Sequence, residues 1–168
     1  MEAARQLSAG IDAFTDLVGR ATSWLALGLA LVMGANVLLR YGFSLGWIWA
    51  QELEWHILVP ICLLGMSYAL RHGEHVRVDV LFASFTERNK LLVEFITALI
   101  SMTVCVIIID LSWSYVAYSW NIGEDSANPG GIPARYLLKA LIPIGFALLF
   151  LQSLAQAIQY FYAWRRAD

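Results

Sequence analysis

The sequence predicts an all-α protein with four transmembrane helices and short amphipathic segments at the membrane interface. Hydrophobic residues make up 60% of the 168 residues and charged residues 14%, whereas soluble domains have about 45–50% and about 25%. The apolar residues gather into long blocks, and the charges, glycines and prolines lie between them. Blocks of this kind are typical of membrane spans. We expect one membrane domain over residues 1–168, with spans at about 21–42, 48–71, 87–119 and 134–163.

The first block follows a polar lead over residues 1–20. Apolar residues at helical spacing in the lead predict an amphipathic helix that lies along the interface. The block behind the lead is too long for the apolar region of a signal peptide, so we interpret it as a retained span. Ala26, Ala30 and Gly34 form a stripe of small residues on this span, which favours close packing with another helix. Arg40 closes the span.

The second span begins in an aromatic and acidic segment. Trp47 and the tryptophans that follow it suit the level of the lipid headgroups. The apolar stretch 57–70 holds only 14 residues, fewer than the about 20 that a helix needs to cross the hydrocarbon. The helix must therefore include the turn that contains Glu52 and Glu54.

The third and fourth spans are separated by a reversal of the chain. The connection before the third span is the most basic one, and residues 84–87 fit a capping box that starts a helix near Phe85. Turn-forming residues are dense between the third and fourth spans, so the chain reverses there. Pro133 suits the first turn of the fourth helix. Pro143 lies inside that helix and predicts the one proline kink that we expect in the chain.

The positions of the basic residues predict the orientation. Of the eleven Lys and Arg residues, eight lie before the first span, between the second and third, or after the fourth. The opposite side has three, namely Arg40, Arg135 and Lys139. The positive-inside rule therefore places both termini and the middle connection in the cytoplasm.

Ionisable residues inside the spans require partners, because each costs about 2.5–3.5 kcal/mol on insertion scales. Counting residues places Asp110 and Lys139 at similar depths on the third and fourth spans, so we hypothesise an ion pair between them. We hypothesise a second pair between Arg40 and Glu52 at the outer ends of the first two spans. The alternative is that Asp110 binds a proton or cation in transport, but a lone acid makes a poor ion site. Three glutamines line one face of the fourth span and predict hydrogen bonds to a neighbouring helix: Gln152, Gln156 and Gln159.

The histidines and cysteines do not form the pattern of a cofactor site. A membrane haem needs histidines on facing helices, and the first, third and fourth predicted spans have none. His72 and His75, with Glu74 and Asp79, form a loose metal-binding pattern, although an ordinary polar loop accounts for them better. Cys62 and Cys105 are interpreted as small buried hydrophobes. We expect no catalytic residue, metal, cofactor or nucleic-acid partner.

Several motifs resemble one transporter family. The segment RYGF at 40–43, with Trp47 and QEL at 51–53, precedes the string GMSYALRHGEHVRVD at 65–79. GIP at 131–133 and IPIG at 142–145 lie farther along the chain. Together these segments resemble the small membrane subunit of tripartite ATP-independent periplasmic (TRAP) transporters, the DctQ type, over about residues 20–160. The string at 65–79 is the specific part.

The resemblance implies a multi-pass, non-enzymatic subunit of the bacterial inner membrane. It implies two protein partners, a large membrane subunit that moves like an elevator and a periplasmic substrate-binding protein, with membrane lipids around them. In this family the sodium and substrate sites belong to the large subunit, and the small subunit braces it during uptake of organic acids.

The resemblance gives one segment an expected role, and the predicted topology gives a role to two more. Segment 71–79 would anchor the inner face, with Arg71, His75, Arg77 and Asp79 meeting lipid phosphates or partner loops; an ordinary positive-inside loop is an equal alternative. The connections around 47–52 and 124–135 form the surface on which we expect the binding protein to dock.

Two other classes of function are kept as alternatives. The first is a membrane cytochrome-type electron-transfer subunit, which a Soret band in the purified protein would reveal. The second is a self-sufficient small transporter, which would move solute in vesicles that contain this chain alone.

Overall fold

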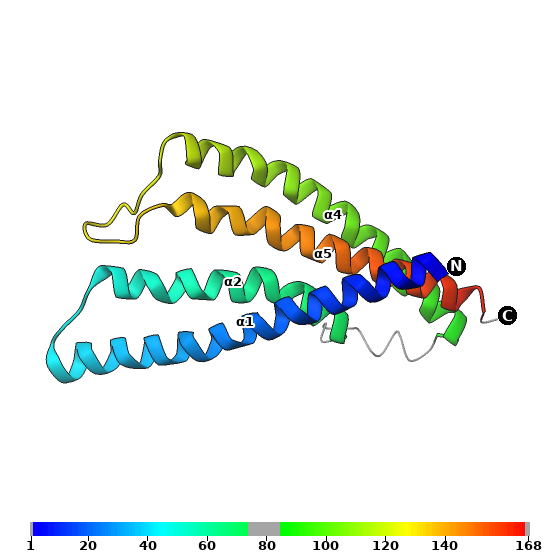
Figure 1. The fold of residues 1–168 in the computed structure, drawn as a ribbon, viewed down its shortest axis with the longest axis horizontal. Helices are drawn as coiled ribbons and strands as arrows, with labels where there is room; N and C mark the ends of the chain where they lie inside the picture. The colour runs from blue at the N-terminus through cyan, green and yellow to red at the C-terminus, as the bar shows by residue number, and fades with distance from the viewer. Residues whose placement is uncertain (1, 74–84, 167–168) are drawn as a thin grey trace.

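The protein is a bundle of two helical hairpins. The computed structural model describes residues 2–73 and 85–166. Helix α1 (Glu2–Phe43) pairs with α2 (Ile48–His72), and α4 (Glu87–Asn121) pairs with α5 (Arg135–Trp164) (Figure 1). Both hairpin connections lie at one end of the bundle, which we call the loop end; the start of α1 and the end of α5 lie at the other, the terminal end (Figure 1). The four described helices are each long and apolar enough to cross a membrane, which confirms the predicted all-α membrane fold.

The lead and the first span form one helix, which corrects the prediction of a separate interfacial helix. α1 runs without a break for 42 residues, or about 63 Å at 1.5 Å per residue. Of the predicted apolar face of the lead, Ile11 is buried, whereas Phe14 and Leu17 are exposed. The residues that bury the first half of α1 are mostly small or hydroxylated: Ser8, Ile11, Thr15, Gly19 and Thr22. The lead therefore packs on protein through small residues.

α2 contains a proline that the sequence analysis did not count as a kink. Pro60 lies inside the helix, and its ring cannot donate a hydrogen bond to the carbonyl of His56 one turn earlier. Two proline-containing helices are thus present among the described residues, not one, because α5 contains Pro143 as predicted. α2 ends at Gly73, whose φ of 73° lies in the left-handed region that glycine adopts without strain.

α4 begins at Glu87, the predicted start of the third span and two residues after the helix start that the capping box predicted near Phe85. Its N-cap is Thr86, whose side chain accepts a hydrogen bond from the backbone N–H of Asn89 at 3.4 Å. Ser84, the predicted first residue of the capping box, lies outside the described residues. The cap on Thr86 places Glu87 in the first turn of α4, where a carboxylate favours the positive end of the helix dipole.

α5 is the central helix of the bundle. It packs against α4, α2 and α1, and α1 also packs along α2. In the apolar stretch of α5, 22% of the residues are buried within the chain, compared with 6% in the apolar stretches of α1 and α2. Two glycines allow close helix crossings: a Cβ at Gly145 of α5 would lie 2.8 Å from the carbonyl oxygen of Leu63 of α2, and Gly19 of α1 lies directly against the ring of Tyr68 of α2.

The interior contains small and polar residues, while large apolar side chains cover the surface. Buried residues include Cys105, Ser67, Ser119, Gln152 and Ser153. Exposed large side chains occur on every described helix, for example Trp24, Leu31, Leu111 and Leu137. Helices in lipid gain nothing by hiding leucine from hydrocarbon, so they pack through small residues and side-chain hydrogen bonds. The arrangement is that of a multi-pass membrane protein.

Candidate functional site

A buried carboxylate organises the loop end. Glu52, in the first turns of α2, is 2% exposed. Its Oε1 accepts hydrogen bonds from Ser126 Oγ at 2.5 Å, Asn128 Nδ2 at 3.0 Å and an Arg135 guanidinium nitrogen at 3.2 Å. Its Oε2 accepts a hydrogen bond from the backbone N–H of Ile132 at 2.7 Å. A single side chain of the first hairpin therefore holds the connection of the second hairpin.

The backbone of that connection is shaped for the carboxylate. A Cβ at Gly131 would lie 2.6 Å from Glu52 Oε2, so the loop reaches this distance only with glycine. Gly130 and Ala134 have φ values of 77° and 60°, and the Asp125 carboxylate accepts a hydrogen bond from the backbone N–H of Ala134 at 2.8 Å. This hydrogen bond supports a left-handed residue that is not glycine, directly before α5.

A second carboxylate lies next to this loop. Glu124 accepts hydrogen bonds from the Lys139 ammonium and from Ser119 Oγ, the latter at 2.6 Å. The Lys139 ammonium, followed by the Ser119 hydroxyl, holds the pKa of Glu124 below its ordinary value. The Lys139 Nζ also lies 4.0 Å from the centre of the Tyr115 ring, a cation–π contact. Lys139 is thereby enclosed at the junction of α4 and α5.

Both hypothesised ion pairs are wrong. Glu52 pairs with Arg135 instead of Arg40, and Lys139 pairs with Glu124 instead of Asp110. Asp110 is exposed on α4, beside a surface hollow formed with Val106, Ile109 and Trp113. The depth of Asp110 was counted correctly along the helix, but its side chain points away from α5 because of its position around the helix axis.

We call Glu52, Ser126, Asn128, Arg135 and the N–H of Ile132 the loop-end cluster. Next to this cluster, hydrogen bonds also link α1 to α2. Asn36 of α1 donates from Nδ2 to Glu54 Oε1 at 2.7 Å and to the carbonyl of Ala50 at 2.9 Å. The predicted contact residues Arg40 and Trp47 are exposed here, and Trp47 stacks with Trp49 at 6.4 Å between ring centroids. The structure thus brings the two expected docking segments, 47–52 and 124–135, together through Glu52.

A second polar cluster lies at the terminal end, where α1 crosses α2. The Arg71 guanidinium donates to Asp16 Oδ2 at 2.9 Å and lies 4.0 Å from Asp12 Oδ1. His72 Nε2 lies 3.1 Å from Asp16 Oδ1. Arg71, which was expected to meet lipid phosphates or partner loops, is therefore paired inside the chain. The other residues predicted in that segment, His75, Arg77 and Asp79, lie outside the described residues.

The glutamines of α5 complete this cluster, as predicted from their common face. Gln152 and Gln159 donate hydrogen bonds to the two carboxylate oxygens of Asp12, each at 2.9 Å. Gln156 donates to the carbonyl of Leu70 at 2.8 Å, and Gln159 also lies 3.1 Å from Ser8 Oγ. The prediction of glutamine bonds to neighbouring helices is confirmed. We call Asp12, Asp16, Arg71, His72, Gln152 and Gln159 the terminal-end cluster.

Sequence reasoning missed most members of the loop-end cluster and, in the terminal-end cluster, the two aspartates. Asp12 and Asp16 are spaced i, i+4 in the lead and therefore share a helix face, which was the available signal for a contact on α1. Ser126 and Asn128 carried no such signal, because loop residues have no periodicity. Arg135 is the first residue of α5, and its position did not indicate Glu52 as its partner. Among residues 2–73 and 85–166, no group of three or more His, Cys, Asp and Glu side chains has the arrangement of a metal site.

Comparison with known proteins identifies the family. Residues 29–162 match the family model described as "Tripartite ATP-independent periplasmic transporters, DctQ component". The chain belongs to this family. The matched region begins in α1 at residue 29 and reaches the last turn of α5, so the DctQ match includes part of each described helix or all of it, and the whole loop-end cluster.

Three curated relatives show how the DctQ region occurs elsewhere. A Haemophilus influenzae protein named provisionally as a TRAP transporter small permease protein is 32% identical over 62% of this chain and 63% of its own length. The ectoine TRAP transporter small permease protein TeaB of Halomonas elongata is 25% identical over 80% of this chain and 70% of its own length. The sialic acid TRAP transporter permease protein SiaT of Haemophilus influenzae is 27% identical over 77% of this chain, but that match spans 20% of SiaT.

Proposed function

We propose that this DctQ-family chain is the small membrane subunit of a TRAP transporter and braces a larger permease subunit. The observation that carries the proposal is the family match over residues 29–162, which contains α2, α4, the second part of α1 and nearly all of α5. The relation to SiaT supports a permease partner, because a region similar to this chain there forms one fifth of a longer permease protein.

The surface of the bundle suits a supporting subunit. The outer half of α1 exposes large apolar side chains such as Leu31 and Leu38, and α4 exposes Ile100 and Leu111. Exposed small residues accompany them on α1, at Ala26, Ala30 and Gly34, where a partner helix would approach closely. In the described apolar spans the one exposed acid facing away from the bundle near mid-depth is Asp110, which is too little for an ion pathway.

The proposal includes an orientation and a docking surface. By the positive-inside rule, the terminal end lies on the cytoplasmic side of a bacterial inner membrane and the loop end on the periplasmic side. The loop held by Glu52 then faces a periplasmic substrate-binding protein as a preorganised surface. Sodium coupling and the choice of an organic acid belong to the partners, because the described residues of this chain offer no site for either.

The decisive experiment is co-purification and reconstituted uptake. The chain is expressed with a candidate large TRAP permease subunit from the same organism, and uptake is measured in proteoliposomes with a candidate binding protein and a sodium gradient. We expect uptake from the pair and none from either membrane subunit alone. Uptake by the large subunit alone at the full rate, or by this chain alone, would contradict a bracing role.

The docking surface needs a variant that leaves the loop intact. Reversing Glu124 or Asp125 would break the contacts with Lys139 and Ala134, so the loss of uptake would not report on docking. Ala127 is exposed in the same loop, and Ala127→Arg adds bulk and charge there. We expect lower uptake with a normal yield of the membrane complex, whereas the exposed control Leu137→Arg at the side of α5 tests for a general effect of the added charge. Unchanged uptake with Ala127→Arg would remove this loop from the docking surface.

A further inference from the structure

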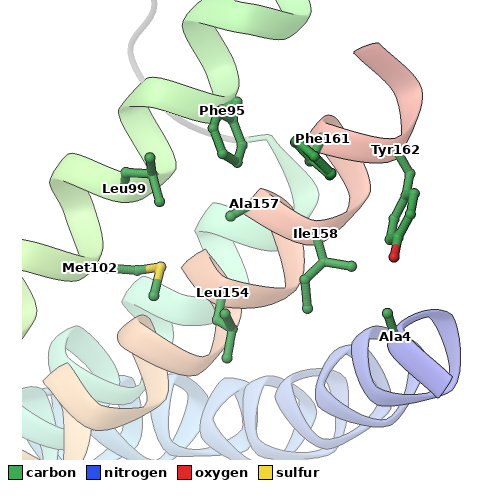
Figure 2. A pocket seen from close by; sticks show the side chains of 9 residues that line it. All are labelled: Ala4, Phe95, Leu99, Met102, Leu154, Ala157, Ile158, Phe161 and Tyr162. Atoms are coloured by element: carbon green, nitrogen blue, oxygen red, sulfur yellow. The ribbon is translucent and has the colours of Figure 1, made fainter. Parts of the chain in front are cut away.

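An apolar groove runs along α5 at the terminal end. Figure 2 shows its floor, formed by α5 residues including Leu154 and Ile158, one wall formed by α4 with Phe95 and Met102, and the edge formed by Ala4 at the start of α1. The cavity has a volume of about 370 Å³, within the roughly 300–1,000 Å³ of small-molecule sites. Its lining is almost wholly apolar, so it suits a hydrocarbon chain.

The groove opens next to a basic cavity. A second cavity, of about 190 Å³, shares Ile158 and Tyr162 with the groove and is lined by Arg5 of α1 and Arg166, which follows α5. Both arginines are exposed. Gln159 and Ser8 add polar atoms to the same cavity. A cationic cavity therefore continues directly from an apolar groove.

The dimensions match one leaflet of a bilayer. From Leu154 to Tyr162 the helix rises about 12 Å, compared with about 15 Å for half of a hydrocarbon core of about 30 Å. The basic cavity lies at the end of the helix, where α5 reaches its last turn at Trp164. Apolar groove and arginines thus follow each other in the same order as the acyl chain and phosphate of a phospholipid.

We propose that this site binds one acidic phospholipid. An acyl chain lies in the groove over α5, and the lipid phosphate is held between Arg5 and Arg166. Guanidinium groups form bidentate hydrogen bonds with phosphate oxygens, and two of them favour a headgroup whose net charge is negative. The site is independent of the proposed transport role, since it uses contacts of this chain alone.

Native mass spectrometry of the full-length chain in detergent tests the proposal. The delipidated protein is titrated with palmitoyl-oleoyl phosphatidylglycerol, with the phosphatidylcholine of the same acyl chains, and with sn-glycerol 3-phosphate. We expect one tightly retained phosphatidylglycerol, weaker phosphatidylcholine and no retained glycerol phosphate. Equal retention of the two lipids, or binding of glycerol phosphate alone, would overturn the proposal.

Charge variants distinguish the site from general attraction. Arg5→Gln with Arg166→Gln should lower the affinity for phosphatidylglycerol roughly 30-fold, from the usual contribution of two basic residues near anionic lipid. The matched control, Arg20→Gln with Arg40→Gln, removes the same charge from α1 away from the groove and should bind like the wild type. Equal losses in the two double variants would contradict a specific site.

A groove variant tests the position of the acyl chain. Leu99, whose side chain is labelled in the wall of the groove (Figure 2), is 44% exposed, so Leu99→Trp fills the groove without entering the core. The control Leu111→Trp lies on the same helix at a position that is 68% exposed. We expect Leu99→Trp to retain the lipid more weakly than the wild type, and Leu111→Trp to retain it equally well. If adding the large permease subunit releases the lipid completely, the groove is a protein interface and the proposal is wrong.

Discussion

The loop-end and terminal-end clusters use carboxylates in opposite ways. At the loop end one carboxylate, Glu52, is 2% exposed and receives four hydrogen bonds, three from the connection between α4 and α5 and one from Arg135 at the start of α5. At the terminal end the side chains of Asp12 and Asp16 are each 22% exposed and contact residues of α2 and α5. The first cluster clamps a loop, and the second links three helices at the edge of the bundle.

The difference in exposure between the two clusters determines how much each one contributes to stability. Water competes little with the hydrogen bonds of Glu52, so the loss of its charge leaves several donors without a partner. Water reaches Asp16 and Arg71, which screens their attraction and offers both groups an alternative when the pair is broken. We therefore expect substitutions at the loop end to cost more stability than those at the terminal end.

The largest effect is expected from Glu52→Gln. The substitution keeps the volume but removes the charge that Arg135 faces and turns one acceptor into a donor, so the melting temperature should fall by about 10 °C. Thermal unfolding followed by fluorescence-detected gel filtration measures it. Gln51→Ala, an exposed change in the same turn, should stay within about 1 °C. Equal melting temperatures for the two variants would break the comparison.

The next effect is expected from Gly131→Ala. The added Cβ would overlap Ser126 Oγ and would lie 2.6 Å from Glu52 Oε2, so this part of the loop-end cluster must move apart and the melting temperature should fall by about 6 °C. Gly42→Ala is the matched control, because a Cβ there meets nothing within 4 Å. A fall of the same size in both variants would show that the loss does not come from crowding in the loop-end cluster.

A smaller effect is expected from Asp16→Asn at the terminal end. The substitution removes the ion pair with Arg71 and weakens the contact with His72, whose side chains are 25% and 42% exposed, so the melting temperature should fall by about 2 °C. If Asp16 and His72 act through their mutual contact, adding His72→Asn to Asp16→Asn should lower the melting temperature little further. A loss as large as that of Glu52→Gln would overturn the contrast between the two ends.

The smallest effect concerns acid and the carboxylate of Glu124. Because the folded state lowers its pKa from 4.5, the ionised group stabilises the fold fully above pH 4.5, and this contribution is lost as the pH falls through the lowered value. The difference in melting temperature between wild type and Glu124→Gln should therefore shrink as the pH falls below 4.5. A difference that stays constant down to pH 3 would mean that the Lys139 contact does not depend on charge.

The helices of this protein were predictable because each one corresponds to a continuous apolar block in the sequence. The partners of the charged residues were not, because depth along a helix says nothing about rotation around it. The face that α4 buries is marked by Ala98, Cys105, Ser112 and Ser119, which recur every seven residues as in packed helix pairs. Asp110 lies two residues from Ser112, about 200° around the helix, and so could not reach Lys139.

For the polar clusters too, the sequence indicated which residues seek a partner but not which partner they find. The glutamines of α5 share a helix face, so their bonding to a neighbour was predictable, but the identity of Asp12 as their acceptor depends on the crossing angle of α1. The site around Glu52 depends on the path of an irregular loop. Its glycines and prolines predicted a reversal, and nothing in their order predicted which carboxylate the loop would enclose.

The length of α1 gives the molecule one adjustable part. Every residue that α1 buries lies between Ser8 and Thr22, so its inner half is seated on α2 and α5 while the outer arm is largely uncovered by its own chain. Tilting that arm breaks few contacts within the chain. A bilayer that thins or thickens by a few ångströms can therefore be matched by a change in the tilt of this arm, at the modest cost of hydrophobic mismatch, while the remaining helices keep their packing.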